Sequence, residues 1–207
     1  EFHVAGFEEI VFQFVLMLKK KINILKLLRP VRAYNGLDYN HATNVAVLTL
    51  FQAQALGIKE EFHRDIGLAA LLHDVGKLFV SKEMHNKKSS PGLKESEAMK
   101  LHPFYGAQYL AKINDLTYLA PIVAFQHHLR YDGRGYPQLK TINMKQHICS
   151  QMTAISDSFD NLRITTPYRR ALDVKDALVT MKTKDEGLFN PFLIDNFLVM
   201  QETDGWF

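Results

Sequence analysis

Apolar side chains recur at helical spacing along almost the whole chain, and this pattern limits the fold more than any other feature of the sequence. Between residues 41 and 56, Val45, Leu48 and Leu56 belong to one such run, which Gly57 ends. Similar patterns cover residues 60–72, 95–113, 121–131, 144–162, 174–181 and 191–200. The strand alternation of βαβ units and internal repeats are both missing from the sequence. The pattern therefore predicts an all-α helical bundle.

Local signals place several helix ends and the intervening loops. Pro121 suits the first turn of a helix, while Asp173 and Asn190 suit N-cap positions. Residues 82–94 are polar and contain Pro91-Gly92, and residues 132–137 are rich in glycine, so both segments are predicted to be loops.

We expect three parts along the chain: an amphipathic, basic helical segment or linker over residues 1–34, one domain over residues 35–200, and a tail over residues 201–207. Six Lys and Arg residues and no acidic residue lie between Glu9 and Asp38. They exceed the whole net charge of +3, so the rest of the chain is slightly acidic and a nucleic-acid polymer is not an expected partner. The basic segment could instead lie on a membrane surface.

Composition narrows the class of protein further. A single cysteine, Cys149, excludes an intramolecular disulfide framework and any multi-cysteine zinc or iron–sulfur site. The longest apolar stretch, residues 10–18, is much shorter than the about 20 residues of a membrane span. We therefore expect a cytoplasmic protein without a transmembrane span. Because the chain begins at Glu1, we also expect it to be part of a longer protein, which could reach a membrane through its N-terminal regions.

The histidines and two aspartates carry the chemistry. They lie in or beside apolar helical runs, where a buried imidazole or carboxylate needs a partner. Isolated histidines, such as His63 and His147, fit ordinary surface or core positions. The joint pattern instead predicts convergence on metal in the core of the bundle. The candidate ligands are His41, His73, Asp74, His102, His127, His128 and Asp157.

Two of the candidate pairs are adjacent in sequence, which restricts how they can act together. Neighbours on a helix point about 100° apart. His73-Asp74 can therefore serve one ion where a helix end bends, or Asp74 can bridge two ions with its two oxygens. His127-His128 is subject to the same limit. All ligands are nitrogen or oxygen, which favours iron or manganese, with zinc, nickel and cobalt also compatible.

The ordered motifs resemble the HD-GYP family, a branch of the HD phosphohydrolases. The resemblance covers about residues 35–200. It rests on His73-Asp74-Val75-Gly76-Lys77, His102-Pro103-x-x-Gly106, His127-His128, Asp132-Gly-Arg-Gly-Tyr136-Pro137, Asp157-x-x-Asp160, Pro167-Tyr168-Arg169 and Gly187-Leu-Phe189-Asn-Pro191. It implies an HD-domain helical bundle that holds two or three metal ions. It also implies hydrolysis of cyclic di-GMP, or of a related cyclic dinucleotide, to the linear dinucleotide or GMP.

Matched position by position, the resemblance implies one ion on His41, His73, Asp74 and Asp157. It implies a second ion on Asp74, His102, His127 and His128, with Asp74 and a hydroxide bridging the two ions. Asp74 and Lys77 would be catalytic.

The resemblance also implies groups that bind the substrate: Lys77, Arg169, Arg163, Asp132 and Tyr136. The loop 132–137 would dock a GGDEF-type cyclase, and a sensor or receiver domain would lie upstream.

Several positions depart from the family pattern. Leu37 replaces a glutamate that binds a third ion, which favours two ions. Leu129 and Thr166 replace a family glutamate and arginine, with Arg163 a substitute for the latter, and Asn161 replaces an alanine. A second hypothesis is thus a regulatory module that binds metal or nucleotide and hydrolyses little. A third, a di-iron oxygenase, conflicts with Lys77 and the Tyr136-Pro137 loop.

Overall fold

The computed structural model describes residues 4–19, 39–80, 97–138, 145–166, 169–183 and 186–203. All regular elements among them are helical, which confirms the all-α prediction. The α-helices are α1 Val4–Lys19, α2 Tyr39–Ala55, α3 His63–Leu71, α6 His102–Leu110, α7 Leu119–Gln126, α8 Ile148–Leu162, α9 Val174–Thr183 and α10 Pro191–Thr203. Two short 3-10 helices, η2 Glu60–Phe62 and η3 Val75–Phe79, flank α3.

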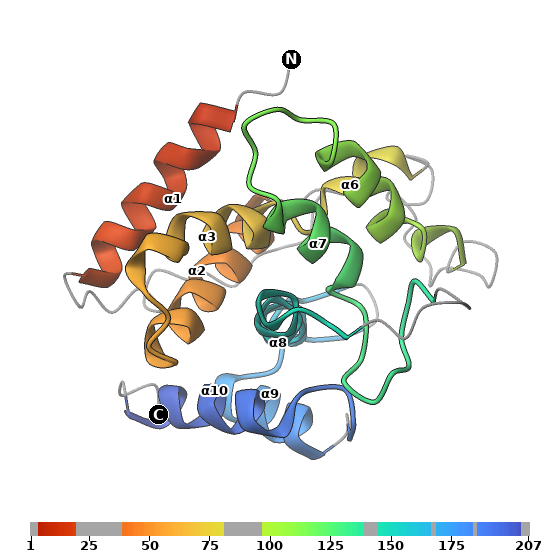
Figure 1. Ribbon diagram of the computed structural model, residues 1–207. Coiled ribbons are helices and arrows are strands. Elements are labelled where there is room, and N and C mark those ends of the chain that lie inside the picture. Colours follow the sequence, from red (N-terminus) through yellow and green to blue (C-terminus); the bar gives the residue numbers. More distant parts are fainter. Residues whose placement is uncertain are drawn as a thin grey trace.

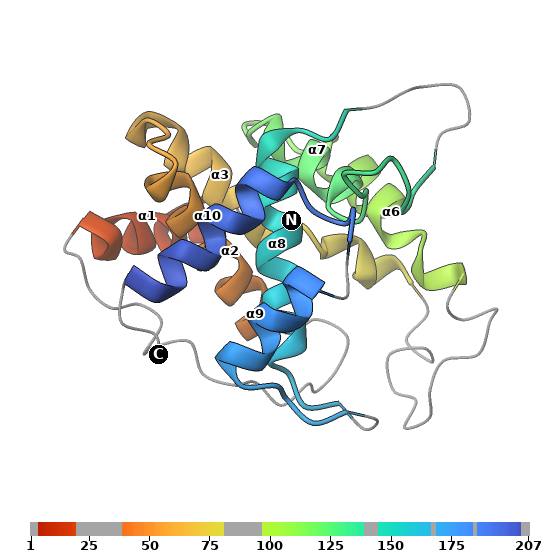
Figure 2. The ribbon, with the colours of Figure 1, turned by 90° about the horizontal axis from the view of Figure 1, so that it is seen from below.

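Helix α8 is the central element of the bundle (Figure 1). It packs against α2, α7, α9 and α10, and α3 fits between α2 and α7. Seen from below, α10 passes in front of α8, on the same face of the bundle as α9 (Figure 2). Phe159 of α8 and Phe197 of α10 are fully buried and meet edge to face, with ring centroids 5.3 Å apart. The apolar face of α8 therefore organises the core.

Most helix ends follow the local signals. The side chains of Asp173 and Asn190 accept hydrogen bonds from the first turns of α9 and α10, as the sequence predicted. Gly57 follows α2 with a φ of +69°, a conformation that glycine adopts without strain.

Three predicted helices are shorter than expected. Of the predicted helix 95–113, the described residues 97–113 do not form one helix, since α6 begins only at His102, where Pro103 occupies the first turn. Helix α7 ends at Gln126 rather than near Tyr131. Helix α8 begins at Ile148 rather than Met144, because the side chain of His147 caps it by accepting a hydrogen bond from the backbone N–H of Cys149.

The N-terminal helix α1 packs on α3 beside the main bundle (Figure 1). Val11 is fully buried there, and its side chain occupies the space that a Cβ at Gly67 would need. Among the described residues no helix has the length and apolarity of a membrane span. The predicted loop 82–94 and most of the basic segment before residue 39 lie outside the described residues.

Candidate metal centre

The structure brings all seven candidate ligands together in the interior. Six of them are almost fully buried, and His128 is half-buried. They form two adjacent groups. The first half-site consists of His41, His73 and Asp157, and the second half-site consists of Asp74, His102, His127 and His128. Within each half-site, one potential ligand atom from every residue lies within 4.8 Å of all the others.

His73 and Asp74 reach the centre from the bend between α3 and η3. Helix α3 ends at Leu71, and Leu72 and Asp74 both have ψ near zero, so the backbone turns there. This bend allows two adjacent side chains to point inward, as one of the two sequence interpretations required.

Asp74 is grouped with the second half-site, but its carboxylate also borders the first. Its Oδ2 is 3.3 Å from Nε2 of His73 and 3.8 Å from Nε2 of His41, on the side of the first half-site. Its Oδ1 is 3.1 Å from Nε2 of His102 and 3.6 Å from Nε2 of His127, on the side of the second. Each carboxylate oxygen thus faces a different half-site.

Hydrogen bonds to backbone carbonyls orient three of the histidines. The Nδ1 atoms of His73, His102 and His127 lie 2.8, 2.7 and 2.9 Å from the carbonyl oxygens three residues earlier. A carbonyl only accepts, so each Nδ1 carries a proton, and in the neutral form of each ring the Nε2 lone pair then faces the centre.

The arrangement of these lone pairs fits a bound metal. Nε2 of His102 and Nε2 of His127 lie 3.2 Å apart, and two lone pairs at this distance repel unless a cation lies beside them. Among the described residues, Nε2 of His73 and Oδ1 of Asp74 are buried without a hydrogen-bond partner. Buried polar atoms of this kind need a ligand, and nitrogen and oxygen donors suit iron, manganese or zinc.

The protonation states also favour metal in the second half-site. Burial and the neighbouring His73 outweigh the attraction of Asp74 and lower the pKa of His127 to about 4. Burial and His127 lower the pKa of His128 well below its usual value. Burial opposes the charge of Asp74, but Lys77 and the histidines outweigh it and hold the pKa of that carboxyl well below its usual range. Neutral imidazole and ionised carboxylate are the forms that bind metal.

Two motif glycines set the distance between Asp74 and His102. A Cβ on Gly76 would lie 1.9 Å from the backbone oxygen of His102 and 2.6 Å from the backbone nitrogen of Gly106. A Cβ on Gly106 would in turn lie 3.1 Å from the backbone nitrogen of Gly76. The glycines therefore let η3 approach the start of α6 closely enough for the two ligands to meet.

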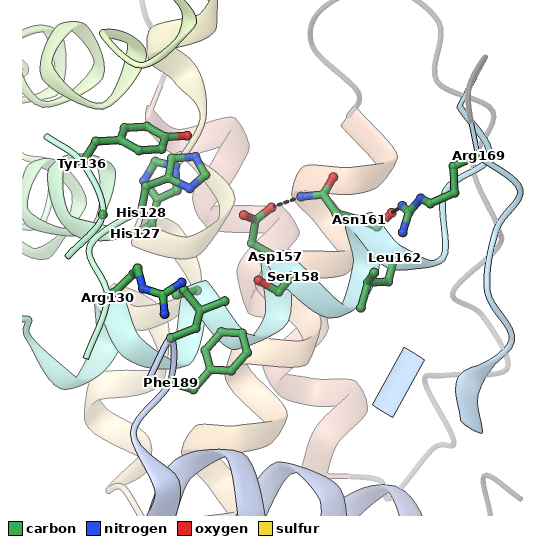
Figure 3. Close-up of a pocket in the computed structure, with 13 residues that line it drawn as sticks. His127, His128, Arg130, Tyr136, Asp157, Ser158, Asn161, Leu162, Arg169 and Phe189 are labelled. Atoms are coloured by element: carbon green, nitrogen blue, oxygen red, sulfur yellow. Dashed lines mark hydrogen bonds between the residues drawn. The ribbon is translucent and has the colours of Figure 1, made fainter. Parts of the chain in front are cut away.

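The centre opens into a groove of about 430 Å³. His127, His128 and Asp157 belong to its wall, and Figure 3 shows Tyr136 and Arg130 at one end and Arg169 at the other. The rest of the lining combines Gly135 and the polar side chains of Ser158 and Asn161 with four apolar side chains: Ala154, Leu162, Leu188 and Phe189. A cavity that combines cationic ends, apolar walls and a candidate metal centre suits a planar, anionic ligand.

Tyr136 and Arg169 therefore lie in the groove, as the resemblance led us to expect. The ring of Tyr136 stacks on His128, with centroids 4.6 Å apart, because Gly135 lets the loop approach the backbone of His128. Nη2 of Arg169 donates to the backbone oxygen of Asn161 at 2.6 Å, and the side chain of Asn161 donates to Asp157 (Figure 3).

The remaining three candidates for substrate binding, Asp132, Arg163 and Lys77, do not line the groove. Asp132 does not line the groove but accepts hydrogen bonds from Arg130 and Arg134, which hold its pKa well below the usual range. Arg163 is also absent from the lining, and its guanidinium lies 5.3 Å from the ring centroid of Phe159. Lys77 donates to Oδ2 of Asp74 at the edge of the centre, because residues three apart lie above one another in a 3-10 helix.

Sequence analysis missed two residues that contribute to the site. Arg130 lines the groove and is held by Asp132, a pairing that its position two residues before that aspartate could have suggested. Asp160 contacts His41 from one turn beyond Asp157, and the Asp157-x-x-Asp160 spacing was the available signal.

Of the departures from the family pattern, Leu37 lies outside the described residues. Leu129 pairs with Gly135 through the backbone, and Thr166 pairs with Arg169 in the same way. Neither side chain lines the groove.

An all-α bundle with a buried histidine and aspartate centre and the ordered motifs above defines an HD-type domain. The family model described as HD domain matches residues 31–191. The chain belongs to this family, and its ordered motifs resemble those of the HD-GYP branch.

Similar proteins include a cyclic di-GMP phosphodiesterase of Thermotoga maritima, 29% identical over 86% of this chain and 49% of that protein. The 3'3'-cGAMP-specific phosphodiesterase 3 of Vibrio cholerae is 34% identical over 69% of this chain and 30% of its own length. The chain spans about half or less of these relatives. Among solved structures, Bd1817, an HDG"Y"P protein from Bdellovibrio bacteriovorus, matches with a TM-score of 0.75 and 18% identity, covering 94% of this chain and 62% of that one.

Proposed function

We propose that the chain is the catalytic domain of a metal-dependent phosphodiesterase that hydrolyses cyclic di-GMP, or a related cyclic dinucleotide, to the linear dinucleotide or GMP. The observation that carries the proposal is the opening of the candidate metal centre into a groove with arginines at both ends. Family membership and the relatives named as cyclic di-GMP and cGAMP phosphodiesterases support it.

His41, His73, Asp157 and Oδ2 of Asp74 would hold one ion, and Oδ1 of Asp74 with His102, His127 and His128 would hold the other. Iron or manganese suits this donor set best. When bound, such a pair supplies Lewis-acid stabilisation of phosphoryl oxygens and lowers the pKa of a coordinated water. The protein fixes the positions of these donors by burial and by the carbonyl hydrogen bonds of the histidines.

The cationic side chains would meet the charge of the substrate. Lys77 is partly exposed beside Asp74, where its ammonium can meet a phosphoryl oxygen as negative charge develops. Arg130 and Arg169 would hold the second phosphate or the leaving portion of the dinucleotide, since the planar guanidinium suits phosphate. Tyr136 and Phe189 offer aromatic faces for a base.

Turnover by the metal-loaded protein tests this proposal. The chain is purified without oxygen, its metals are counted, and the same sample is incubated with cyclic di-GMP, 3'3'-cGAMP, cyclic di-AMP and a simple phosphodiester. We expect hydrolysis of a cyclic dinucleotide with the linear dinucleotide as a main product. A sample with two ions per chain that cleaves none of the cyclic dinucleotides would contradict the proposal.

A regulatory module is the second candidate, and Thr166 favours it because the family arginine is missing there. This module would bind a cyclic dinucleotide without cleaving it and would act through protein contacts. Thr166→Arg should improve turnover modestly by lowering KM about threefold. Residues paired across an antiparallel bridge project to the same side, so the new guanidinium would lie beside that of Arg169. No gain in either affinity or rate would contradict this role for position 166.

We also propose that the loop 132–137 is a docking surface for a GGDEF-type cyclase, as the family resemblance implies. The side chain of Arg134 is 72% exposed and that of Tyr131 is half-exposed, so both are accessible to a partner. We also propose that a sensor or receiver domain lies upstream of this chain in the whole protein. We further propose that the protein is cytoplasmic. Loss of binding to a purified cyclase in Arg134→Glu would test the docking surface.

A further inference from the structure

His41 is oriented differently from His73, His102 and His127. Those three donate to carbonyls three residues earlier in the chain. His41 is the third residue of α2 and lies in its first turn. Its Nδ1 instead lies 2.7 Å from Oδ2 of Asp160, a residue 119 positions away on α8.

Asp160 is itself held in place. It is 4% exposed, and its Oδ1 accepts a hydrogen bond of 2.8 Å from Nδ2 of Asn44, which lies one turn after His41 on α2. Its two oxygens therefore accept from two donors of the same neighbouring helix. The opposite nitrogen of His41, Nε2, is 3.0 Å from Oδ1 of Asp157 and faces the first half-site.

We propose that Asp160 is a positioning residue for the first half-site. Its carboxylate keeps the proton of His41 on Nδ1 and fixes the ring, so that the Nε2 lone pair faces an ion bound there. A carboxylate behind a ligating histidine commonly raises metal affinity about 10- to 100-fold. The inference rests on the metal centre of the proposed function, and it assigns to this side chain a role that differs from ligation.

The test measures binding of Mn²⁺ alone to the metal-free full chain. The electron paramagnetic resonance signal of the unbound ion reports how much Mn²⁺ remains free. The wild type should bind two ions. Asp160→Ala removes the acceptor and should weaken one of the two ions by about 10- to 100-fold while the other keeps its affinity. Asp160→Asn should recover most of this affinity, because its amide oxygen can still accept from His41 once the amide of Asn44 turns over.

Thr49→Val is the matched control. Thr49 on α2 donates to Oγ of Ser156 on α8 at 3.0 Å, so this variant also removes a buried hydrogen bond between the two helices, but one that involves none of the seven candidate ligands. Both ions should keep their affinity in Thr49→Val. Circular dichroism and thermal unfolding of the metal-free variants establish that each is folded.

Unchanged affinity for both ions in folded Asp160→Ala would overturn the proposal. It would also be overturned if Thr49→Val weakened an ion equally, or if Asp160→Asn lost as much affinity as Asp160→Ala. Absence of manganese binding by the wild type would overturn it too. Binding requires no nucleotide, so a chain that binds two ions and hydrolyses nothing would refute the phosphodiesterase while leaving the role of Asp160 intact.

Discussion

The two half-sites of the centre are built in different ways. The second half-site draws three histidines from a short part of the chain, residues 102–128, on or after α6 and α7. Two of them are oriented by carbonyls of their own segments. The first half-site joins α2, the bend after α3, and α8, and a side-chain carboxylate on another helix orients His41. The second half-site therefore depends on local geometry and the first on long-range packing.

The two half-sites also differ in the pKa values of their histidines. Burial opposes charge on His41, but hydrogen bonds to Asp157 and Asp160 outweigh it and raise the pKa of His41 to about 10. Burial and His73 instead lower the pKa of His127 to about 4. In the metal-free chain, an ion entering the first half-site must therefore displace a proton from His41, whereas the second half-site already offers neutral nitrogen ligands. We expect two ions of unequal affinity.

The largest effect should come from Asp74, which both half-sites share. Asp74→Ala should abolish binding of both ions and reduce turnover by at least about 1000-fold, which is about 4 kcal/mol of transition-state stabilisation. Metal analysis and hydrolysis of cyclic di-GMP on one sample measure both quantities. Retention of one full ion by the folded variant would show that the half-sites do not share this carboxylate.

Separate histidine variants should distinguish the half-sites. His102→Ala should mainly empty the second half-site and His41→Ala the first, so that each protein keeps about one ion and loses turnover by about 100-fold. Manganese titrations of the two variants should therefore report different remaining affinities. Equal remaining affinities would contradict the contrast between the half-sites.

Gly76→Ala tests how closely η3 must approach α6. The added Cβ would lie 1.9 Å from the backbone oxygen of His102, so η3 and α6 must separate. We expect a loss of about 2–3 kcal/mol in the free energy of unfolding, together with weaker binding in the second half-site. Urea unfolding with and without Mn²⁺ measures both. Gly6→Ala is the control, because no atom lies within 4 Å of a Cβ at that position.

The smallest effect concerns Lys77, which contacts the oxygen of Asp74 on the side of the first half-site. Lys77→Ala should lower turnover by somewhat more than about tenfold, or about 1.4 kcal/mol, at equal metal content, because negative charge that develops on phosphate loses a partner. The ion count should stay at two. A rate equal to that of the wild type would remove Lys77 from the catalytic residues.

Sequence by itself determined the fold class, the family and the seven residues that gather in the centre. Helical periodicity and the caps at Asp173 and Asn190 are local properties, so they can be recognised without knowing the packing. The order of the motifs identified the family for the same reason. The predicted ends of α7 and α8 were wrong by a few residues, because the turn after Gln126 and the cap at His147 gave weaker signals.

Tertiary structure alone decided how these residues divide into two half-sites and what supports them. Asp157 and Asp160 lie one turn apart on α8, yet one faces the centre while the other supports His41 from behind. Asp132 turned out to hold Arg130, and Arg163 to lie over Phe159, rather than to line the groove. The contact between Asp160 and His41 joins two helices 119 residues apart in sequence, and the crossing of packed helices sets such a contact.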